Sequence, residues 1–453
     1  MADRGETMNS AILSEPRQNM GAIRAPGRCV VCASRSLSVV LDLGQQPLAN
    51  GLLKHPDDPA PTLPLRLASC SGCGHVQLAD FAAPEAMFSE YVFRTGASEP
   101  AKAHFWKLAE AIAETVRGGY VCEVGSNDGT LLTALRDEGL EAIGVDPCSV
   151  AQGVEGTVNR YFGRLTAQVL LAEHGPACCV VMCNVLAHAP DPYSLLEGAR
   201  DLLPYGGMLV IEAPYLFDLL AVGAWDTIYH EHFGYFSASV LHRMLTSTGF
   251  MVDRVDREPV HGGSLRVWAR RVVDVQSAPR SAKWTELLRT ESYPEWAGFQ
   301  ARVDAHASAL KAACDVPFIV AYGAAAKATV LLNRTGIRPR YIVDSTPDKQ
   351  GCFIPGTETP IVPPSALKGP GCVCLTPLEG SWTEMGSDYV ALFHPFKGWK
   401  SEKRCLWCRG TGKAPDKILI TAWNYAEHIM AHHTEYAGRW IVPSGPHRTV
   451  EFH

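Results

Sequence analysis

The residues best suited to acid–base chemistry lie together in the stretch Tyr229–His232, which reads Y-H-E-H and is bordered by aromatic residues. A histidine titrates near pH ~6.5, so it can accept a proton close to neutral pH. We therefore expect acid–base catalysis from this cluster, with structural packing and metal binding as alternatives. A metal is less favoured because H-E-H lacks the spacing of H-E-x-x-H and no third ligand is evident. In an extended chain, His230 and His232 share one face, and Tyr229 and Glu231 share the other.

Two pairs of cysteines lie near the N-terminus, Cys29-x-x-Cys32 and Cys70-x-x-Cys73, with 37 residues between them. Two such knuckles supply the four thiolates of a tetrahedral zinc site. The gap is longer than the usual zinc-ribbon spacing, so we expect it to contain a folded insertion. Four sulfur ligands leave no open coordination position, and the predicted zinc is therefore structural rather than catalytic.

A third motif, E-V-G-S-N-D-G, lies within the stretch Tyr120–Asp146. An apolar run turns sharply at Gly125, a helical pattern follows, and a second apolar run ends in Asp146, which is the order of a nucleotide-binding βαβ unit. Gly125 lets the backbone approach a ligand closely, and Asp146 can accept both hydroxyls of a ribose. The acidic turn would repel a pyrophosphate but tolerates a cationic sulfonium.

This motif resembles the first motif of class I S-adenosylmethionine-dependent methyltransferases. The resemblance implies S-adenosylmethionine as the cofactor, with Glu123 and Gly125 near its methionine part and Asp146 on its ribose. The expected cofactor contacts are Glu123, Gly125, Asn127, Asp128, Asp146 and Asn184.

Two buried strands position further polar residues. Asn184 and His188 follow the apolar run Cys179–Cys183 and are expected at the carboxyl end of that strand. Ligands bind at this end of the strands in an open parallel sheet. The run Met208–Ala213 precedes the Y-H-E-H stretch. We therefore expect His188 on the ligand side of the sheet.

A hairpin follows, in which H-G-G-S-L-R joins the strand-like runs Phe250–Arg257 and Ser264–Arg271. The residues His261, Ser264 and Arg266 form an anion-friendly turn and are expected to contact the substrate. A plain hairpin turn with a surface arginine is the alternative.

A second strand, glycine turn and helix pattern lies in V-P-F-I-V-A-Y-G-A-A-A-K, which ends at Lys327. The positive end of the helix together with Lys327 predicts a phosphate site. A purely structural repeat of the fold is the alternative.

Two other segments carry weaker patterns. Tyr91 lies in the aromatic loop Phe81–Phe105 and is expected either to cover a pocket as a lid or to pack. The piece Lys368–Asp416 contains several cysteines among glycines and prolines, which suits an inserted loop, a poorly structured segment or a second metal pair.

Length and composition limit the possible classes of protein. The chain has 453 residues, 47% of them hydrophobic, and is expected to form two to four soluble domains. A net charge of −6 and the lack of a long basic run argue against nucleic-acid binding. No apolar run reaches the roughly 18 residues that a membrane span needs. The 15 cysteines are interpreted as metal ligands and small core residues in a reducing compartment. We therefore expect a cytoplasmic protein.

Four features in this order resemble the nucleotide-sugar C-methyltransferases of deoxysugar biosynthesis: the double CxxC, E-V-G-S-N-D-G, N-V-L-A-H-A-P-D with Y-H-E-H-F-G-Y-F-S, and H-G-G-S-L-R before Y-G-A-A-A-K. The resemblance covers about Arg28–Lys368 and resumes at Asp416–Pro443. It implies an α/β enzyme with a small N-terminal zinc-binding domain, a central class I methyltransferase Rossmann-like domain and a C-terminal Rossmann-like domain.

The resemblance also implies a reaction. The substrate would be a dTDP-linked 4-keto-deoxyhexose, methylated at the carbon next to the ketone after removal of a proton. By family position His232 would be the base, with Tyr229, Glu231 and His188 orienting it or stabilising the enolate. Phe93 stands where the family's Y-x-Y lid motif has a second tyrosine after Tyr91.

The expected organisation follows from these assignments. It comprises a disordered tail (1–25), a zinc-binding domain (26–98), a methyltransferase domain (99–275), a helical connector (276–313) and a C-terminal Rossmann-like domain (314–453) with an insertion near 368–416. We expect a monomer that acts on a small molecule. The alternatives are an O- or N-methyltransferase, or a zinc-binding scaffold with an inactive methyltransferase fold.

Overall fold

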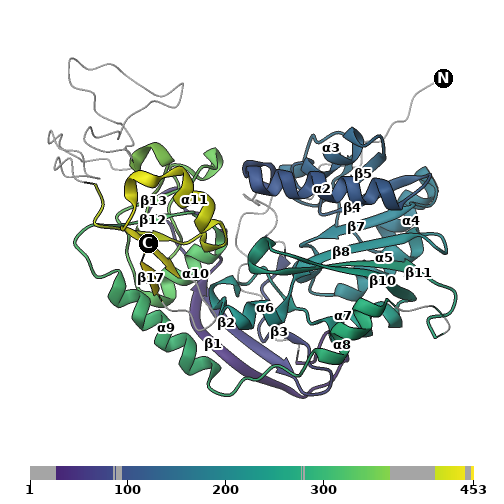
Figure 1. Cartoon of the computed structure of the whole chain (residues 1–453), viewed down its shortest axis with the longest axis horizontal. Coiled ribbons are helices and arrows are strands. Elements are labelled where there is room, and N and C mark those ends of the chain that lie inside the picture. The colour runs from purple at the N-terminus through teal and green to yellow at the C-terminus, as the bar shows by residue number, and fades with distance from the viewer. Residues whose placement is uncertain are drawn as a thin grey trace, which may run out of the picture.

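The computed structural model describes residues 27–84, 87, 94–276, 278, 281–367, 414–443 and 450–452. The predicted tail, the lid residues Tyr91 and Phe93, and residues 368–413 of the predicted insertion lie outside the described residues. The described chain contains three sheets, of four, seven and six strands. Figure 1 shows the seven-stranded and six-stranded sheets in two separate lobes, with strands β1 and β2 running beneath them.

The seven-stranded sheet has the order β10-β11-β8-β7-β4-β5-β6. The strands from β8 to β6 are parallel, and β10 and β11 close the sheet as an antiparallel hairpin. Its strands are β4 (Tyr120–Val124), β5 (Glu141–Val145), β6 (Thr157–Val158), β7 (Cys179–Cys183), β8 (Met208–Pro214), β10 (Phe250–Glu258) and β11 (Ser264–Arg271).

Helices cover both faces of this sheet, which explains why its central strands are apolar on both sides. One face packs against α2 (Glu99–Thr115) and α3 (Thr130–Asp137), and the other against α5 (Pro192–Leu202) and α7 (Ala238–Ser247) (Figure 1). Neighbouring residues of β7 alternate between the two cores. The remaining helices of this lobe are α4 (Arg164–His174), α6 (Leu216–Ala221) and α8 (Ala282–Thr290).

The N-terminal sheet has the order β1-β2-β3-β9, and its last strand comes from the central part of the chain. Its strands are β1 (Leu37–Pro47), β2 (Thr62–Cys70), β3 (Val76–Leu78) and β9 (Gly234–Tyr235). Val76 of β3 pairs with Tyr235 of β9, two residues after the aromatic residue that ends the Y-H-E-H-F stretch. The N-terminal sheet therefore continues directly into the predicted catalytic segment.

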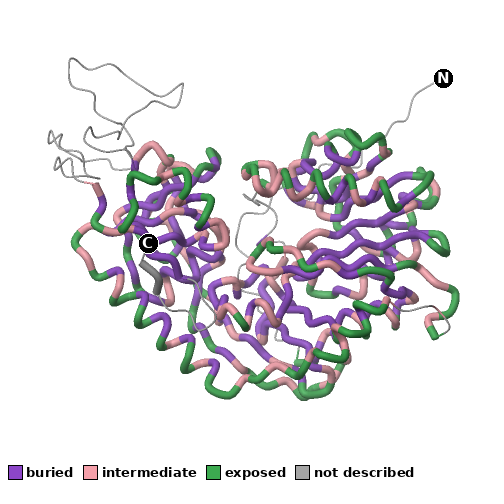
Figure 2. The backbone as a smooth tube through the Cα atoms, viewed as in Figure 1, coloured by how far each residue is buried: buried purple, intermediate pink, exposed green. Residues whose placement is uncertain are grey.

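The C-terminal sheet has the order β14-β13-β12-β15-β16-β17 and is parallel except for its last pair. One hydrophobic core joins this sheet to β1, β2 and β3, and Figure 2 shows the buried chain following the strands of both lobes. The elements are α9 (Phe299–Ala313), β12 (Ile319–Tyr322), α10 (Ala326–Thr335), β13 (Ile342–Val343), β14 (Ile361–Val362), β15 (Lys417–Ile420), α11 (Ala426–His432), β16 (Trp440–Pro443) and β17 (Val450–Phe452).

The strands expected from the sequence lie within one or two residues of their predicted positions, and the helices differ more. Helix α2 begins at Glu99, inside the stretch Phe81–Phe105 that was expected to form an aromatic loop. The α/β class and the methyltransferase-type central sheet are as predicted.

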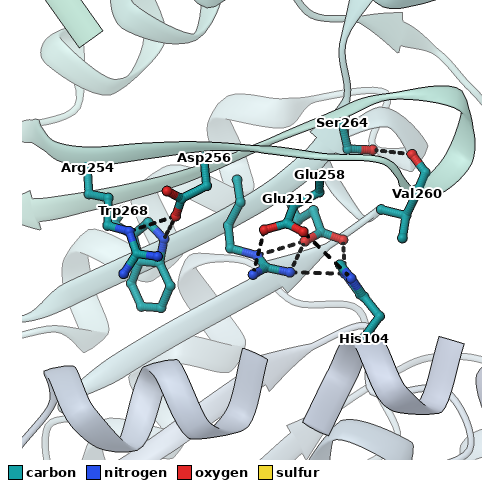
Figure 3. A network of polar contacts seen from close by, with 9 residues as sticks. His104, Glu212, Arg254, Asp256, Glu258, Val260, Ser264 and Trp268 are labelled. Carbon is teal, nitrogen blue, oxygen red and sulfur yellow. Dashed lines mark hydrogen bonds and ion pairs between the residues drawn. The ribbon is translucent and has the colours of Figure 1, made fainter. Parts of the chain in front are cut away.

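A buried polar network joins α2 to the edge of the central sheet (Figure 3). The Nε of Arg266 on β11 donates to Glu212 on β8 at 2.8 Å, and another guanidinium nitrogen lies 2.9 Å from Glu258 on β10. The Nε2 of His104 on α2 lies 2.7 Å from Glu212. Burial raises the pKa of Glu212, but His104 and Arg266 outweigh this and lower it.

This network corrects the prediction for the hairpin. The guanidinium of Arg266 is 6% exposed and lies between two carboxylates, so its hydrogen-bond donors are already used within the protein. The hydroxyl of Ser264 donates to the Val260 carbonyl at 3.1 Å, and Ser264 is fully buried. The internal partners of Ser264 and Arg266 therefore argue against a direct contact with the substrate.

Replacing Arg266 by Met is expected to destabilise the protein by about 3–5 kcal/mol, because Glu212 is then buried without its cation. Arg270→Met is the matched control on the same strand, where the side chain is 44% exposed and 2.8 Å from Asp253. We expect about 0–1 kcal/mol there, because surface ion pairs contribute little. Urea unfolding followed by circular dichroism compares the two variants, and equal losses would contradict the assigned difference.

Candidate active site

The four cysteines of the two knuckles meet in space. Their sulfur atoms all lie within 4.8 Å of one another, and those of Cys29 and Cys73 are 3.6 Å apart, as are those of Cys32 and Cys70. Four sulfurs held about 2.3 Å from one zinc ion in a tetrahedron are separated by about 3.8 Å, so the cluster fits zinc. All four ligands come from the protein, which is the arrangement of a structural site.

The cofactor turn has the geometry that a closely approached ligand needs. Gly125 follows β4 with a φ of +75°, and a side-chain Cβ there would lie 2.4 Å from Val185. The carboxylate of Asp146, at the end of β5, accepts the backbone N–H groups of Asn127 at 2.8 Å and Cys148 at 2.7 Å. These two bonds hold the carboxylate at the carboxyl end of the parallel strands.

Three carboxylates gather at this turn. Glu123 is 5% exposed, and its Oε2 is buried without a hydrogen-bond partner. Burial, followed by the charges of Asp146 and Asp128, raises the pKa of Glu123 well above its usual value. Among the residues that the structure describes, none of the three carboxylates has a salt-bridge partner. A ligand that carries positive charge fits this set, and S-adenosylmethionine carries both a sulfonium and an ammonium group.

The other predicted cofactor residues have definite partners. Asp128 accepts the backbone N–H of Gly96 at 2.8 Å and the hydroxyl of Thr130 at 2.6 Å, so it ties the chain before α2 to the start of α3. The Asn127 side chain accepts the N–H of Thr95 at 3.0 Å. Asn184 follows β7 in a left-handed conformation with a φ of +57°. Their contacts to the cofactor stay predictions.

The turn Tyr229–His232, which we call the catalytic turn because the sequence predicts catalysis there, is not an extended strand. The His232 N–H donates to the Tyr229 carbonyl at 3.0 Å, and the Tyr229 hydroxyl lies 2.8 Å from Nε2 of His232. The expected sharing of faces is therefore wrong, because the reversal of the chain brings Tyr229 and His232 together. His230 points instead to the Pro64 carbonyl at 3.3 Å. Asn50 donates to the Glu231 carboxylate at 2.6 Å.

This divergence of side chains argues against the metal alternative. Within the described part of the chain, the cysteine cluster is the only group of three or more potential ligands. His230 and Glu231 are buried and bind the N-terminal sheet and its loop, whereas Tyr229 and His232 stay partly accessible. We therefore interpret His230 and Glu231 as holding the turn in place.

The ring of His232 has a defined tautomer. Its Nδ1 lies 3.2 Å from the Thr227 carbonyl, which can only accept, so Nδ1 carries the proton. Nε2 then has the lone pair and accepts the Tyr229 hydroxyl. The ring of His188 lies beside it, with centroids 4.8 Å apart at an angle of 72°.

Both imidazoles are neutral near pH 7. Burial, together with His188, lowers the pKa of His232 well below its usual value, and burial lowers the pKa of His188 to about 4. Burial has the opposite effect on a carboxyl group and raises the pKa of Glu231 to about 7. A neutral His232 has the lone pair that a general base requires.

A second group of polar residues combines the turn after β10 with the C-terminal lobe. His261, an exposed residue on that turn, lies within electrostatic reach of Lys327 on α10. The charge of His261 acts in turn on His188 and His232. The ammonium of Lys327 lies 4.4 Å from the centre of the Trp423 ring and donates to the side chain of Asn424.

Several residues of this site escaped the sequence interpretation. They are Asn50, Thr227, Trp423 and Asn424, together with His104, Glu212 and Glu258 of the buried network. The sequence shows Trp423 next to Asn424, but no local pattern relates that pair to Asp226, 197 residues earlier.

Comparisons with known proteins agree with this geometry. Residues 29–88 match a family model described as "Putative zinc binding domain", residues 101–255 match "Methyltransferase domain" and residues 259–376 match "C-methyltransferase C-terminal domain". The C-methyltransferase NovU of Streptomyces niveus is 29% identical over 453 residues, which cover 94% of this chain and 98% of that relative. By these matches the chain is an S-adenosylmethionine-dependent methyltransferase, similar along nearly its whole length to a C-methyltransferase.

Other relatives match a smaller part of this chain. The ubiquinone biosynthesis O-methyltransferase of Stutzerimonas stutzeri is 28% identical over 134 residues, which cover 25% of this chain and 58% of that relative. The structure of magnesium protoporphyrin IX methyltransferase from Synechocystis PCC 6803 aligns with 38% of this chain and 82% of its own, at 16% identity and a TM-score of 0.28. Within the described residues, every helix is too short or too polar to cross a membrane.

For the zinc site, Cys70→Ser is expected to lower the zinc content from one ion per chain and to destabilise the N-terminal sheet, because structural metal binding contributes directly to folding. Cys178→Ser is the control, since Cys178 lies outside the cluster. Metal analysis of both purified variants decides the matter. A full zinc complement in Cys70→Ser contradicts the assignment.

For the cofactor, Asp146→Ala is expected to weaken binding of S-adenosylhomocysteine by about 1.5–3 kcal/mol, the range for a charge-assisted hydrogen bond. Glu141→Ala is the control because Glu141 is an exposed residue at the other end of β5. Isothermal titration calorimetry measures both affinities. Unchanged affinity in Asp146→Ala means that the ribose is held by another group.

Proposed function

We propose that this C-methyltransferase acts on a dTDP-linked 4-keto-deoxyhexose and methylates the carbon next to the ketone through an enolate. The observation that carries the proposal is the pair formed by Tyr229 and His232, with a hydroxyl to Nε2 distance of 2.8 Å, beside the neutral ring of His188. Methyl transfer to oxygen or nitrogen forms no enolate, so it does not explain why the Tyr229 hydroxyl lies against Nε2 of His232.

The chemistry requires a base because carbon is a poor nucleophile until a proton next to the carbonyl is removed. In our proposal Nε2 of His232 takes that proton, and the electrons of the broken C–H bond move to the ketone oxygen. The Tyr229 hydroxyl, released from Nε2, then donates a hydrogen bond to the enolate oxygen. The Thr227 carbonyl stabilises the imidazolium through Nδ1–H.

The negative enolate raises the proton affinity of His232 at the moment of transfer, because opposite charges form side by side in a buried site. A pKa lowered by burial in the resting enzyme is therefore compatible with a base. When bound, S-adenosylmethionine supplies an electrophilic methyl group. In the transfer the enolate carbon would use its electron pair to form the new bond to that methyl group, and the sulfur would keep the electron pair of the bond that breaks.

The catalytic turn lies close to the proposed cofactor site. Burial, followed by the charges of Asp146 and Glu231, raises the pKa of the Cys148 thiol, so the ribose carboxylate and the turn are both near it. In the C-terminal lobe, Lys327 and the Asn424 amide offer cationic and polar groups to the diphosphate of a nucleotide sugar. Mass spectrometry after incubation with a panel of dTDP-4-keto sugars tests the substrate class.

Replacing His232 by Asn is expected to lower turnover by on the order of 10²–10⁴, because it deletes the base but keeps some hydrogen bonding. Affinity for S-adenosylhomocysteine should stay nearly unchanged. The decisive measurement is exchange of the sugar's α-proton with deuterated water, which separates proton removal from methyl transfer. His174→Asn, an exposed histidine on α4, is the control. Wild-type exchange in His232→Asn would make His188 or another residue the base.

A further inference from the structure

The short helix η4, Trp225–Thr227, lies between the catalytic turn and the C-terminal lobe. It packs against α10, and both its tryptophan and its aspartate are buried. The next residues of the chain are the catalytic turn itself. Any shift of this helix therefore moves the groups that hold His232.

One hydrogen bond ties η4 to the C-terminal lobe. The indole Nε1 of Trp423 donates to Oδ2 of Asp226 at 2.8 Å, across 197 residues of sequence. Asp226 is 0% exposed and Trp423 is 9% exposed. A hydrogen bond to a buried carboxyl group is directional and costly to lose, so it fixes the position of Asp226 more sharply than apolar packing does.

A second bond fixes the start of the same helix. The indole Nε1 of Trp225 donates to Nδ1 of His306 on α9 at 2.9 Å. Helix η4 is thus held from two sides, by α9 and by the chain after β15, and both of these elements belong to the C-terminal half.

The C-terminal end of η4 contacts the proposed base, His232. Thr227, the residue after Asp226, presents its carbonyl to Nδ1 of His232 at 3.2 Å, and that contact keeps the proton on Nδ1. The path from the C-terminal lobe to the reactive Nε2 therefore consists of Trp423, Asp226, the Thr227 carbonyl and the imidazole ring.

Trp423 is well placed to respond to the C-terminal lobe. Lys327 lies over its ring, and a side-chain Cβ at Gly262 would lie 2.7 Å from that ring. The indole thus touches the lysine proposed for the diphosphate and the turn that carries His261.

We propose that Asp226 and Trp423 are positioning residues through which the C-terminal lobe sets the tautomer and orientation of His232. This inference rests on the proposed function only in taking His232 as the base. It adds a role for the C-terminal lobe in the chemistry step, since the hydrogen bond crosses from that lobe to the segment that holds the imidazole.

The test is nuclear magnetic resonance of the full chain labelled with ¹⁵N in its histidine rings, saturated with S-adenosylhomocysteine and without sugar. The His232 signals are identified by their loss in His232→Asn. We expect one Nδ1–H pattern in the wild type and its loss, toward a mixture of tautomers, in Trp423→Phe and in Asp226→Ala. Asp226→Asn keeps the wild-type pattern, because an amide oxygen still accepts the indole N–H.

Trp284→Phe is the matched control, because the buried Trp284 also loses an indole bond to a histidine, 3.3 Å from Nδ1 of His242, far from the turn. An unchanged His232 pattern in both Trp423→Phe and Asp226→Ala overturns the proposal. An equal change in Trp284→Phe also overturns it, because it indicates general loosening. No sugar is present, so a wrong substrate class leaves this result intact.

Discussion

The structure depends on the buried middle of the turn Tyr229–His232, because the side chains of His230 and Glu231 must find partners away from water. Each side chain finds one in a different place: Glu231 on Asn50 after β1, His230 on the Pro64 carbonyl of β2, and His232 on the segment that leads into the turn. The N-terminal sheet and the cluster that anchors it therefore support the turn directly. The zinc-binding domain therefore has a physical role in supporting this turn.

The two βαβ units share a geometry and differ in charge. Asp344 in the C-terminal lobe accepts the N–H groups of Ala324 and Thr346 at 2.8 Å each, just as Asp146 accepts two N–H groups in the central lobe. The ammonium of Lys349 lies 3.8 Å from Asp344 and donates to the Ala324 carbonyl at 2.9 Å. The second acidic turn thus has its own cation. Only the first retains uncompensated carboxylates that favour a cationic ligand.

Much of the fold and part of the site could be predicted because the signals were local. The cysteine knuckles, the turn at Gly125 and the apolar strands each depend on residues a few positions apart. The errors arose where distant segments decide the outcome. Arg266 was predicted to contact the substrate, with a surface arginine as the alternative, but it is buried between Glu212 and Glu258. The reversal at Tyr229–His232 contains no glycine or proline to indicate a turn.

The charges of the site explain why burial of histidines suits this reaction. Protonated imidazoles next to a sulfonium would repel it, and burial keeps His188 and His232 neutral at pH 7. The acidic groups lie on the cofactor side, where burial and mutual repulsion raise the pKa of Glu123 and a positive ligand would favour its charged form. In the proposed mechanism, proton transfer to His232 creates an imidazolium and an enolate together, so the site acquires no net charge. The position of Nε2 is decisive in that mechanism, because a proton is transferred only over hydrogen-bonding distance.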